Sequence, residues 1–283
     1  MYRERCQSVE TLPVKLTSPA DNVAVAVGWM KALDIFARRR SPPTYKYSPP
    51  PDPATLALIA LVELRYESFT PNHIRIPRDA ERFSELTQLA LNIGIFAVLQ
   101  SLPQNFPIVL AFEVLLAIYI IWTSMQLALR YKSSPALFGP LYLADSLTGF
   151  WSETWHNVFA SPCQSLCYDP LRYNLPRYGV PVVIARSLGV LAAFGLMGLF
   201  HMYVLAPILP MSSVLRIGAF FLLNGVGTVV EAMVWGKKRH WLKTVLAWTF
   251  ETALATWTAE AAYIPNGLSK IPWKDMCGSP SAW

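Results

Sequence analysis

Two histidines are the residues of this chain whose type and surroundings best suit chemistry. His201 lies deep in the apolar run of residues 180–207, and His156 ends the polar and aromatic segment 150–156, next to Asn157. An ionisable side chain inside such a run is costly to bury, which marks His201 as a functional candidate. A low-dielectric site keeps an imidazole neutral and able to accept a proton. The pair predicts acid–base chemistry on a hydrophobic substrate, without a metal, since no metal-ligand spacing accompanies it.

The composition places these histidines in a membrane protein. Of the 283 residues, 53% are hydrophobic and 15% are charged, and the mean hydropathy is +0.33. Ordinary soluble domains are less apolar and more charged. The predicted fold is an all-α integral membrane bundle of about five spans with interfacial helices. The predicted spans are residues 86–102, 106–129, 180–208, 213–235 and 243–264.

Basic residues concentrate on one side of this predicted topology. Twelve of the 24 lysines and arginines precede residue 86, and others cluster in the connections 130–179 and 236–243. By the positive-inside rule these segments face the cytosol, so a cytosolic N-terminus is predicted. A basic rim suits the anionic surface of a lipid bilayer, and nothing in the sequence supports binding to nucleic acid.

The chain divides into two predicted parts. Residues 1–53 are predicted to be a cytosolic N-terminal segment, and residues 54–283 the membrane-embedded part. The first part contains an amphipathic helix over residues 20–37, where Val23, Val27, Met30 and Leu33 recur at helical spacing. A stiff linker with six prolines follows over residues 41–53, because proline excludes a helix there.

The connection of residues 130–179 is the longest between the predicted spans, and a connection of this length in a compact protein is usually functional. Its middle, residues 141–159, is aromatic and partly apolar. It is predicted to form one or two helices in the cytosolic interface, with Trp151 and Trp155 as anchors.

Several polar residues lie inside the predicted spans. Asn224 and Glu231 are seven residues apart, so on a helix they share one face and form a polar stripe within the membrane. Glu113 and Glu251 also lie within spans. Pairing among such groups is their expected structural role.

Two motifs resemble those of a known enzyme family. Residues 150–156, Phe-Trp-Ser-Glu-Thr-Trp-His, are similar to the Phe-Trp-x-x-x-Trp-His signature of the wax synthase-like branch of the membrane-bound O-acyltransferases. About 45 residues later, residues 195–201 resemble the segment that carries the family's catalytic histidine. Residues 220–231 and the pair Gly28-Trp29 are similar to further family segments. The resemblance extends over most of residues 28–235.

The resemblance implies an acyl-CoA-dependent O-acyltransferase. His201 would be the general base, and His156 with Asn157 would stabilise the oxyanion that forms on the thioester carbonyl. The residues expected to contact the alcohol are Trp151, Trp155, Asn224 and Glu231. The residues expected to bind the phosphates of acyl-CoA are Arg130, Lys132, Arg172 and Arg177.

The same resemblance suggests the substrates and the location. Fungal proteins of this type often acetylate terpenoids and related secondary metabolites, so acetyl-CoA and a small hydrophobic alcohol are expected, with no tightly bound cofactor. An integral protein of the endoplasmic reticulum is expected. Members of the family usually carry further spans before the Gly-Trp segment, so a homo-oligomer or a partner subunit is an open alternative.

Other functions also stay open. A wax-ester-forming enzyme would use long-chain acyl-CoA. An integral-membrane terpene cyclase would protonate its substrate from Glu113, Glu231 or Glu251 and would not need His201. A transporter or an inactive homologue would form no ester at all.

The predicted topology raises a question about the depth of His201. If the third span begins at Val180, a straight helix places His201 about 30 Å further along, away from His156. A tilt, a break near residues 186–189 or a later start of the span would bring the two histidines together.

Overall fold

The computed structural model describes residues 19–74, 84–103, 105–129, 135–236, 238 and 240–261. These residues are largely helical, which agrees with the all-α prediction. They also form one two-stranded sheet. Arg130 and Lys132, which were predicted to bind phosphates, lie outside the described residues.

The N-terminal part combines two helices with the small sheet. Its elements are α1 (Pro19–Ala37), β1 (Thr44–Tyr45), α2 (Pro53–Val62) and β2 (Phe69–Thr70). The predicted helix of residues 20–37 is confirmed by α1, and the proline-rich segment after it is not helical. The two strands pair antiparallel, with Thr44 opposite Thr70, and so bring together the segments before and after α2.

Helices form at all five of the predicted spans. They are α3 (Glu85–Leu99), α4 (Pro107–Leu129), α8 (Val182–Leu205), α9 (Met211–Trp235) and α10 (Trp241–Ala261). Three are long and apolar enough to cross a membrane, namely Pro107–Ala128 of α4 and the whole of α8 and α9. With 15 residues α3 is too short, and α10 is less apolar, so the spanning of these two stays a prediction.

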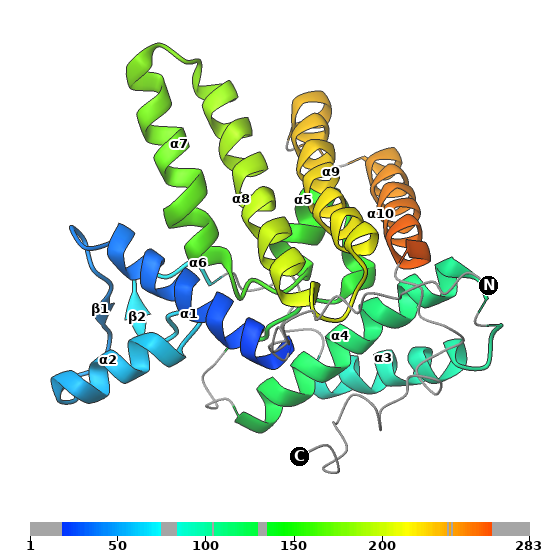
Figure 1. Ribbon diagram of the computed structural model, residues 1–283, viewed down its shortest axis with the longest axis horizontal. Coiled ribbons are helices and arrows are strands. Elements are labelled where there is room, and N and C mark those ends of the chain that lie inside the picture. The colour runs from blue at the N-terminus through cyan, green and yellow to red at the C-terminus, as the bar shows by residue number, and fades with distance from the viewer. Residues whose placement is uncertain are drawn as a thin grey trace, which may run out of the picture.

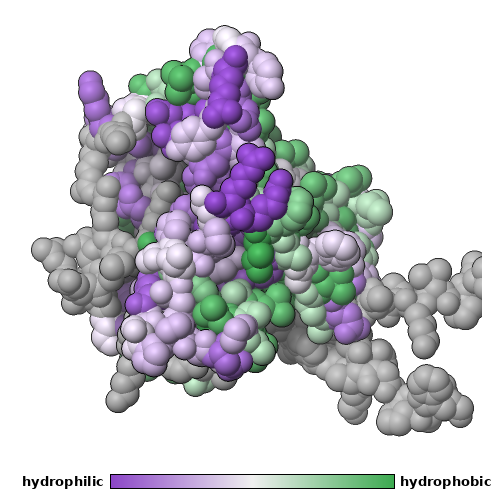
Figure 2. Space-filling view, turned by 90° about the vertical axis from the view of Figure 1, so that its left-hand side faces the viewer, coloured by the Kyte–Doolittle hydropathy of each residue, from purple (hydrophilic) through white to green (hydrophobic). Residues whose placement is uncertain are grey.

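The long helices form two groups. In Figure 1, α8, α9 and α10 stand side by side, while α3 and α4 lie across their lower ends. Contacts between α4 and α10 join the two groups, and α1 packs diagonally against α8. Figure 2 shows hydrophilic residues over the side that carries α7 and the N-terminal elements.

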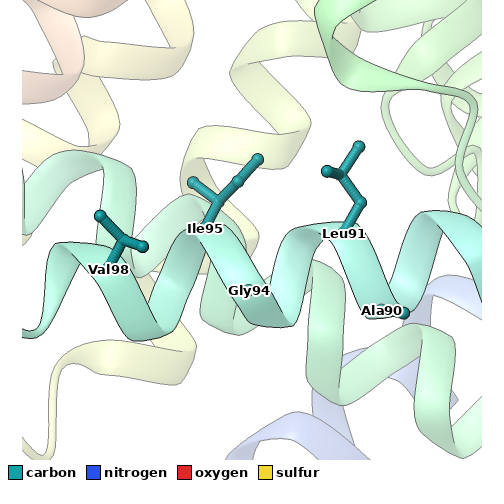
Figure 3. A pocket seen from close by; sticks show the side chains of 5 residues that line it. All are labelled: Ala90, Leu91, Gly94, Ile95 and Val98. Atoms are coloured by element: carbon teal, nitrogen blue, oxygen red, sulfur yellow. The ribbon is translucent and has the colours of Figure 1, made fainter.

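Several helices bury polar residues and expose apolar ones. The buried residues of α3 are Gln88 and Asn92. The exposed side chains of Leu91, Ile95 and Val98 project from one side of α3, where they line an open groove (Figure 3). Helix α9 follows the same rule, since its buried polar residues are Ser213, Asn224, Thr228 and Glu231. This reversed pattern fits a bilayer, because polar groups must then face the interior of the bundle.

The segment predicted to hold interfacial helices folds differently. Over residues 141–154 it forms only three short turns, which are η1 (Leu141–Leu143), α5 (Leu147–Gly149) and the π-helical η2 (Phe150–Thr154). A longer helical run over residues 160–178 was not predicted. It consists of α6 (Ala160–Pro162), the π-helical η3 (Cys163–Tyr168), α7 (Asp169–Asn174) and η4 (Leu175–Tyr178).

This run answers the question about the depth of His201. It lies antiparallel to α8, since Cys163 Sγ contacts the Ala193 carbonyl and Tyr168 packs against Gly189 (Figure 1). Gly179, with a φ of 82° that favours glycine, turns the chain between the two helices. Residues 160–178 extend about 28 Å, so the run returns His156 to the level of His201. Because α8 is continuous from Val182 to Leu205, no break in it is needed.

Candidate active site

His156 and His201 belong to a closed circuit of seven aromatic rings. On one side, His156 contacts Phe159, Phe159 contacts Phe200, and Phe200 contacts His201, with centroid distances of 6.4, 4.8 and 5.1 Å. On the other side, His201 contacts Phe221 at 4.3 Å and Trp151 contacts Phe221 at 5.9 Å. Trp155 closes the circuit, 6.3 Å from Trp151 and 5.2 Å from His156. We call these seven residues the aromatic circuit.

The backbone of α8 fixes the tautomer of His201. Its Nδ1 atom lies 2.8 Å from the carbonyl oxygen of Met197, one helical turn earlier. A carbonyl only accepts hydrogen bonds, so Nδ1 carries the proton and Nε2 carries the lone pair. The imidazole is held further by Phe221, whose ring is stacked at an interplanar angle of 26°. Nε2 is therefore the atom of His201 that can accept a proton.

His156 is surrounded by rings rather than by polar groups. Phe138 lies edge-on to it at 5.5 Å, and Trp155 and Phe159 cover other sides. Its Nδ1 atom is buried without a hydrogen-bond partner among the described residues. Burial, and secondarily the charge of His201, lower the pKa of His156 to about 3. His156 is thus neutral at physiological pH, with one N–H to donate.

Trp151 was predicted to anchor an interfacial helix, but the structure turns it inward. Its Nε1 atom donates to Asn224 Oδ1 at 3.1 Å and to Glu251 Oε1 at 2.7 Å. The π-helical turn of residues 150–154 sets this direction, because it brings Trp151 and Trp155 to one side of the segment. Turns of this kind are frequent at functional sites. Trp151 and Asn224 thereby lie near His201, and their predicted contact with the alcohol stays a prediction.

The carboxylate of Glu231 is hydrogen-bonded to the backbone at the start of α5. Its carboxylate accepts hydrogen bonds from the N–H groups of Leu147 and Thr148 at 2.7 and 3.1 Å, and Lys243 Nζ lies 3.6 Å away. Glu231 and Asn224 thus face the same segment, residues 147–151, which confirms that they share one side of α9. The contacts make Glu231 a support of the segment that carries Trp151.

The remaining predicted residues lie at different distances from the histidines. Asn157 follows His156 directly, and its carbonyl accepts a hydrogen bond from Ala160 N–H at 3.1 Å, where the helical run begins. Arg172 packs over the rings of Tyr168 and Tyr173 at 5.6 and 5.1 Å. Tyr168 packs on Gly189, which is about 18 Å along α8 from His201. Arg177 is exposed and lies still further along, near the turn at Gly179.

Sequence reasoning missed a buried polar cluster between α1 and η3. Asp34 is fully buried, and its carboxylate accepts hydrogen bonds from Ser161 Oγ at 2.7 Å, from Ser165 Oγ, and from Arg38 Nε at 2.8 Å. Arg38 also donates to Ser161 Oγ at 2.8 Å. Burial alone would raise the pKa of Asp34, but these serines and the Arg38 charge lower it below its usual value.

Lys31 extends this cluster. Its ammonium group lies 3.1 Å from the centroid of the Tyr66 ring and donates to the carbonyl of Glu63. Burial lowers the pKa of Lys31 to about 8, against the effect of Asp34 and Glu63. The cluster fastens α1 to Ser161, five residues after His156. A sequence signal for it existed, since Lys31 and Asp34 are the charged residues that follow the first turn of a mostly apolar helix.

The two cysteines near the site are protonated thiols. Burial raises the pKa of the Cys163 thiol to about 12, and it also raises the pKa of Cys167. A thiol in this state is a weak nucleophile. Neither cysteine is therefore suited to form a covalent intermediate.

The fold and the site define a helical membrane protein with two histidines in an aromatic surrounding. Residues 134–223, which include both histidines, match the model of the membrane bound O-acyl transferase family. No solved structure is significantly similar to the protein.

Two kinds of curated relatives are similar to the chain. It is 30% identical over 195 residues to the probable long-chain-alcohol O-fatty-acyltransferase 7 of Arabidopsis thaliana, covering 62% of this chain and 56% of the relative. It is 36% identical over 104 residues to the acetyltransferase ataH of Aspergillus terreus, covering 34% of this chain and 32% of the relative. The resemblance to the wax synthase-like branch of the membrane-bound O-acyltransferases is thereby confirmed. The chain spans about half the length of the first of these relatives.

Proposed function

We propose that the protein transfers an acyl group from acyl-CoA to the hydroxyl of a hydrophobic alcohol, with His201 as the general base. The observation that carries this proposal is the Met197–His201 hydrogen bond, which directs the lone pair of Nε2 away from the helix backbone. It lies in the segment that matches the O-acyltransferase family. A hydroxyl is a poor nucleophile at neutral pH, so a base placed in this way supplies what the reaction needs.

The reaction follows from this geometry in two steps. Nε2 of His201 takes the hydroxyl proton while the alcohol oxygen attacks the thioester carbonyl, and a tetrahedral oxyanion forms. The C–S bond then breaks, the carbonyl is restored, and the departing thiolate takes the proton from His201. The ester and coenzyme A leave, and His201 regains its starting state.

His156 supports the oxyanion in this proposal. A neutral imidazole keeps one N–H, and an N–H aimed at developing negative charge stabilises the transition state. Asn157, next to it, can contribute its amide group. Burial of the unpartnered Nδ1 of His156 fits a site whose hydrogen bond is made with substrate.

Direct transfer is favoured over an acyl-enzyme. Cys163 and Cys167 are held as thiols, and Ser161 donates its hydroxyl to Asp34 while accepting from Arg38. Both substrates would therefore bind before acyl transfer occurs. The proposed phosphate contacts are Arg130, Lys132, Arg172 and Arg177. Arg172 is well separated from His201 along α8, as the phosphates of coenzyme A are separated from its thioester by the pantetheine arm.

Acetyl-CoA is the proposed donor. Helices α8 and α9 approach closely beside His201, since Gly198 packs on the backbone of Gly218 and Gly225 packs on Phe194. A short acyl group would fit between such closely packed helices more readily than a long chain. The similarity to a fungal acetyltransferase agrees with this choice, whereas the similarity to plant long-chain-alcohol acyltransferases supports a long-chain substrate.

The proposed acceptor is a terpenoid or similar alcohol that arrives through the bilayer. Trp151, Trp155 and Asn224 would surround it, and Glu231 would act through its support of residues 147–151. The protein would reside in the endoplasmic reticulum with a cytosolic N-terminus and would bind no permanent cofactor.

An assay on membranes from an expressing host tests the proposal. Labelled acetyl-CoA or palmitoyl-CoA is supplied with terpenoid and long-chain alcohols, and ester formation is measured. We expect His201→Ala to lower the rate by about 10²–10⁴-fold, the range of a general base. His240→Ala, an exposed histidine at the start of α10, is the matched control and should keep the wild-type rate. Equal ester formation by wild type and His201→Ala would refute the role of His201.

A further inference from the structure

Helix α1 buries its polar residues and exposes its apolar ones, the reverse of a helix in a water-soluble protein. From residue 24 to residue 37, every exposed residue of α1 is apolar. The large side chains among them, each at least 41% exposed, are Val25, Trp29, Leu33, Ile35 and Phe36. The polar and charged residues from 22 to 34 are all buried, and they are Asn22, Lys31 and Asp34. The outer side of α1 is therefore an apolar surface, as it is on α9.

Helix α2 packs beside α1 and extends this surface. Its ten residues are apolar apart from Thr55, and none of them is buried. Leu58, Leu61 and Val62 are 60, 51 and 67% exposed. A helix that is apolar all round is normally found inside a protein or a membrane, and soluble proteins rarely leave large apolar patches open. Water is therefore an unsuitable surrounding for these two helices.

The apolar surface of α1 is continuous with that of a helix that can span the membrane. Helix α1 packs against α8, which is long and apolar enough to cross (Figure 1). Asn22 Nδ2 donates to the carbonyl of Tyr203 at 3.0 Å. Tyr203 and Leu199, one turn apart on α8, have exposed side chains. The apolar residues of α1 begin one turn after Asn22, so lipid that covers this part of α8 also reaches α1.

The exposed charges lie between the two helices rather than on them. From residue 24 to residue 62, the exposed charged residues are Arg39, Arg40, Lys46 and Asp52, all in the connection that contains β1. Figure 2 looks onto the side that carries β1, where hydrophilic residues prevail. Arg39 lies 4.2 Å from the ring of Phe36, at the end of the apolar surface. Basic groups at the edge of an apolar surface suit the headgroup level of a bilayer.

We propose that α1 and α2 lie in the membrane, with their exposed apolar sides against the acyl chains and the connection between them at the polar surface of the bilayer. Residues 24–37, which were predicted to belong to a cytosolic segment, are then covered by lipid. Asp34 faces the protein interior, where Ser161 and Ser165 donate to it, as expected for a charge at membrane depth. This position of the two helices goes beyond the proposed acyl transfer and does not depend on it.

Quenching by lipid tests the position of both helices. A cysteine is introduced into the full chain as Leu33→Cys or Leu58→Cys, labelled with a nitrobenzoxadiazole fluorophore, and the protein is placed in phosphatidylcholine nanodiscs. Doxyl-labelled phosphatidylcholine quenches from the acyl-chain region, and iodide quenches from water. We expect both labels to lose as much emission to the doxyl lipid as a label at Leu222→Cys, an exposed position on α9, and to resist iodide.

Ser41→Cys is the matched control, since it changes an exposed residue of the connection between the helices. Its label should be quenched by iodide and much less by the doxyl lipid. Protein without an introduced cysteine, treated in parallel, gives the background from the native thiols. In nanodiscs, Leu33→Asp should lower the thermal unfolding midpoint, because a carboxylate against acyl chains is costly, whereas Ser41→Asp should leave the midpoint unchanged.

The possible results separate the alternatives. Labels at Leu33 and Leu58 that iodide quenches and the doxyl lipid does not would place both helices in water and overturn the proposal. Labels that neither quencher reaches would show that another protein surface, such as a second copy of the chain, covers the helices, and would overturn it as well. If only one of the two labels is quenched by the lipid, the proposal fails for the other helix.

Discussion

His156 and His201 belong to one aromatic circuit, and burial, together with repulsion from His201 whenever that ring is protonated, lowers the pKa of His156 to about 3. In the proposed reaction the two histidines take different roles, although both are imidazoles in aromatic surroundings. His201 has a fixed tautomer with Nε2 as the acceptor, because Nδ1 keeps its proton and donates it in a hydrogen bond to the Met197 carbonyl. His156 is held neutral as a donor.

His156 makes the stability of the protein depend on pH. Its unfolded pKa is near 6.5 and its folded pKa is lower, so its stabilising effect is full above pH 6.5 and is lost as pH falls toward 3. At pH 5 the loss is about 2 kcal/mol. We expect thermal unfolding of the wild type to shift downward between pH 7 and pH 5. The shift should be smaller in His156→Asn, and equal shifts in both proteins would contradict the assignment.

Asp34 should be needed for the stability of the whole bundle. Asp34→Asn removes the charge that Arg38, Ser161 and Ser165 surround, and breaking a buried ion pair costs about 3 kcal/mol. Because the pKa of Asp34 is lowered, its contribution is present above its unfolded value of 3.8 and is lost as pH falls below it. Thermal unfolding at pH 7 measures the loss. Arg39→Ala, an exposed neighbour, should leave the midpoint unchanged.

Local patterns in the sequence predicted the long helices, whereas the catalytic role assigned to the two histidines stays a prediction. They succeeded where the geometry of a single helix fixes the relative positions of two residues. Asn224 and Glu231 are an example, since their spacing alone places them on one side of α9. They failed at residues 160–178, where Pro162, Pro170 and Pro176 argue against a helix. The chain accommodates these prolines because Pro170 and Pro176 each fall in the first turn of a short new helical segment.

Contacts between residues that are distant in the sequence were the second reason why side-chain orientations could not be predicted. The helical spacing grouped Leu33 with Val23, Val27 and Met30 on one apolar face of α1, but Met30 is buried whereas Leu33 is 47% exposed. The next residue, Asp34, is turned inward instead, because its partner Ser161 lies 127 residues away in the chain. Trp151 was placed at the interface for the same reason, since Asn224 and Glu251 are distant in sequence. Such contacts depend on packing that a local pattern does not contain.

Gly225 should matter because it lets α9 approach α8 beside the aromatic circuit. A Cβ at this position would lie 3.0 Å from Cβ of Phe194, whose ring contacts Trp151 at 5.4 Å. We expect Gly225→Ala to destabilise the protein by about 1–3 kcal/mol, the cost of overpacking, and to lower kcat. Gly94→Ala is the matched control, since nothing lies within 4 Å of a Cβ there. A gain of up to about 1 kcal/mol is expected for it from helix propensity.

Arg172 provides the sharpest test of how the donor binds. Its guanidinium is held over Tyr173 at 5.1 Å and lies far from the histidines, so it can contact phosphates without taking part in the chemistry. Arg172→Ala should raise the KM for acetyl-CoA about tenfold, with the KM for the alcohol and kcat unchanged. Added salt should weaken donor binding more in the wild type than in the variant, because it screens exposed charges. Arg172→Lys should keep part of the affinity for acetyl-CoA. Arg39→Ala, which changes an exposed arginine away from the site, is the control and should leave the KM for acetyl-CoA unchanged. If Arg172→Ala raises the KM for the alcohol instead, the phosphates bind elsewhere and Arg172 only supports the helical run of residues 160–178.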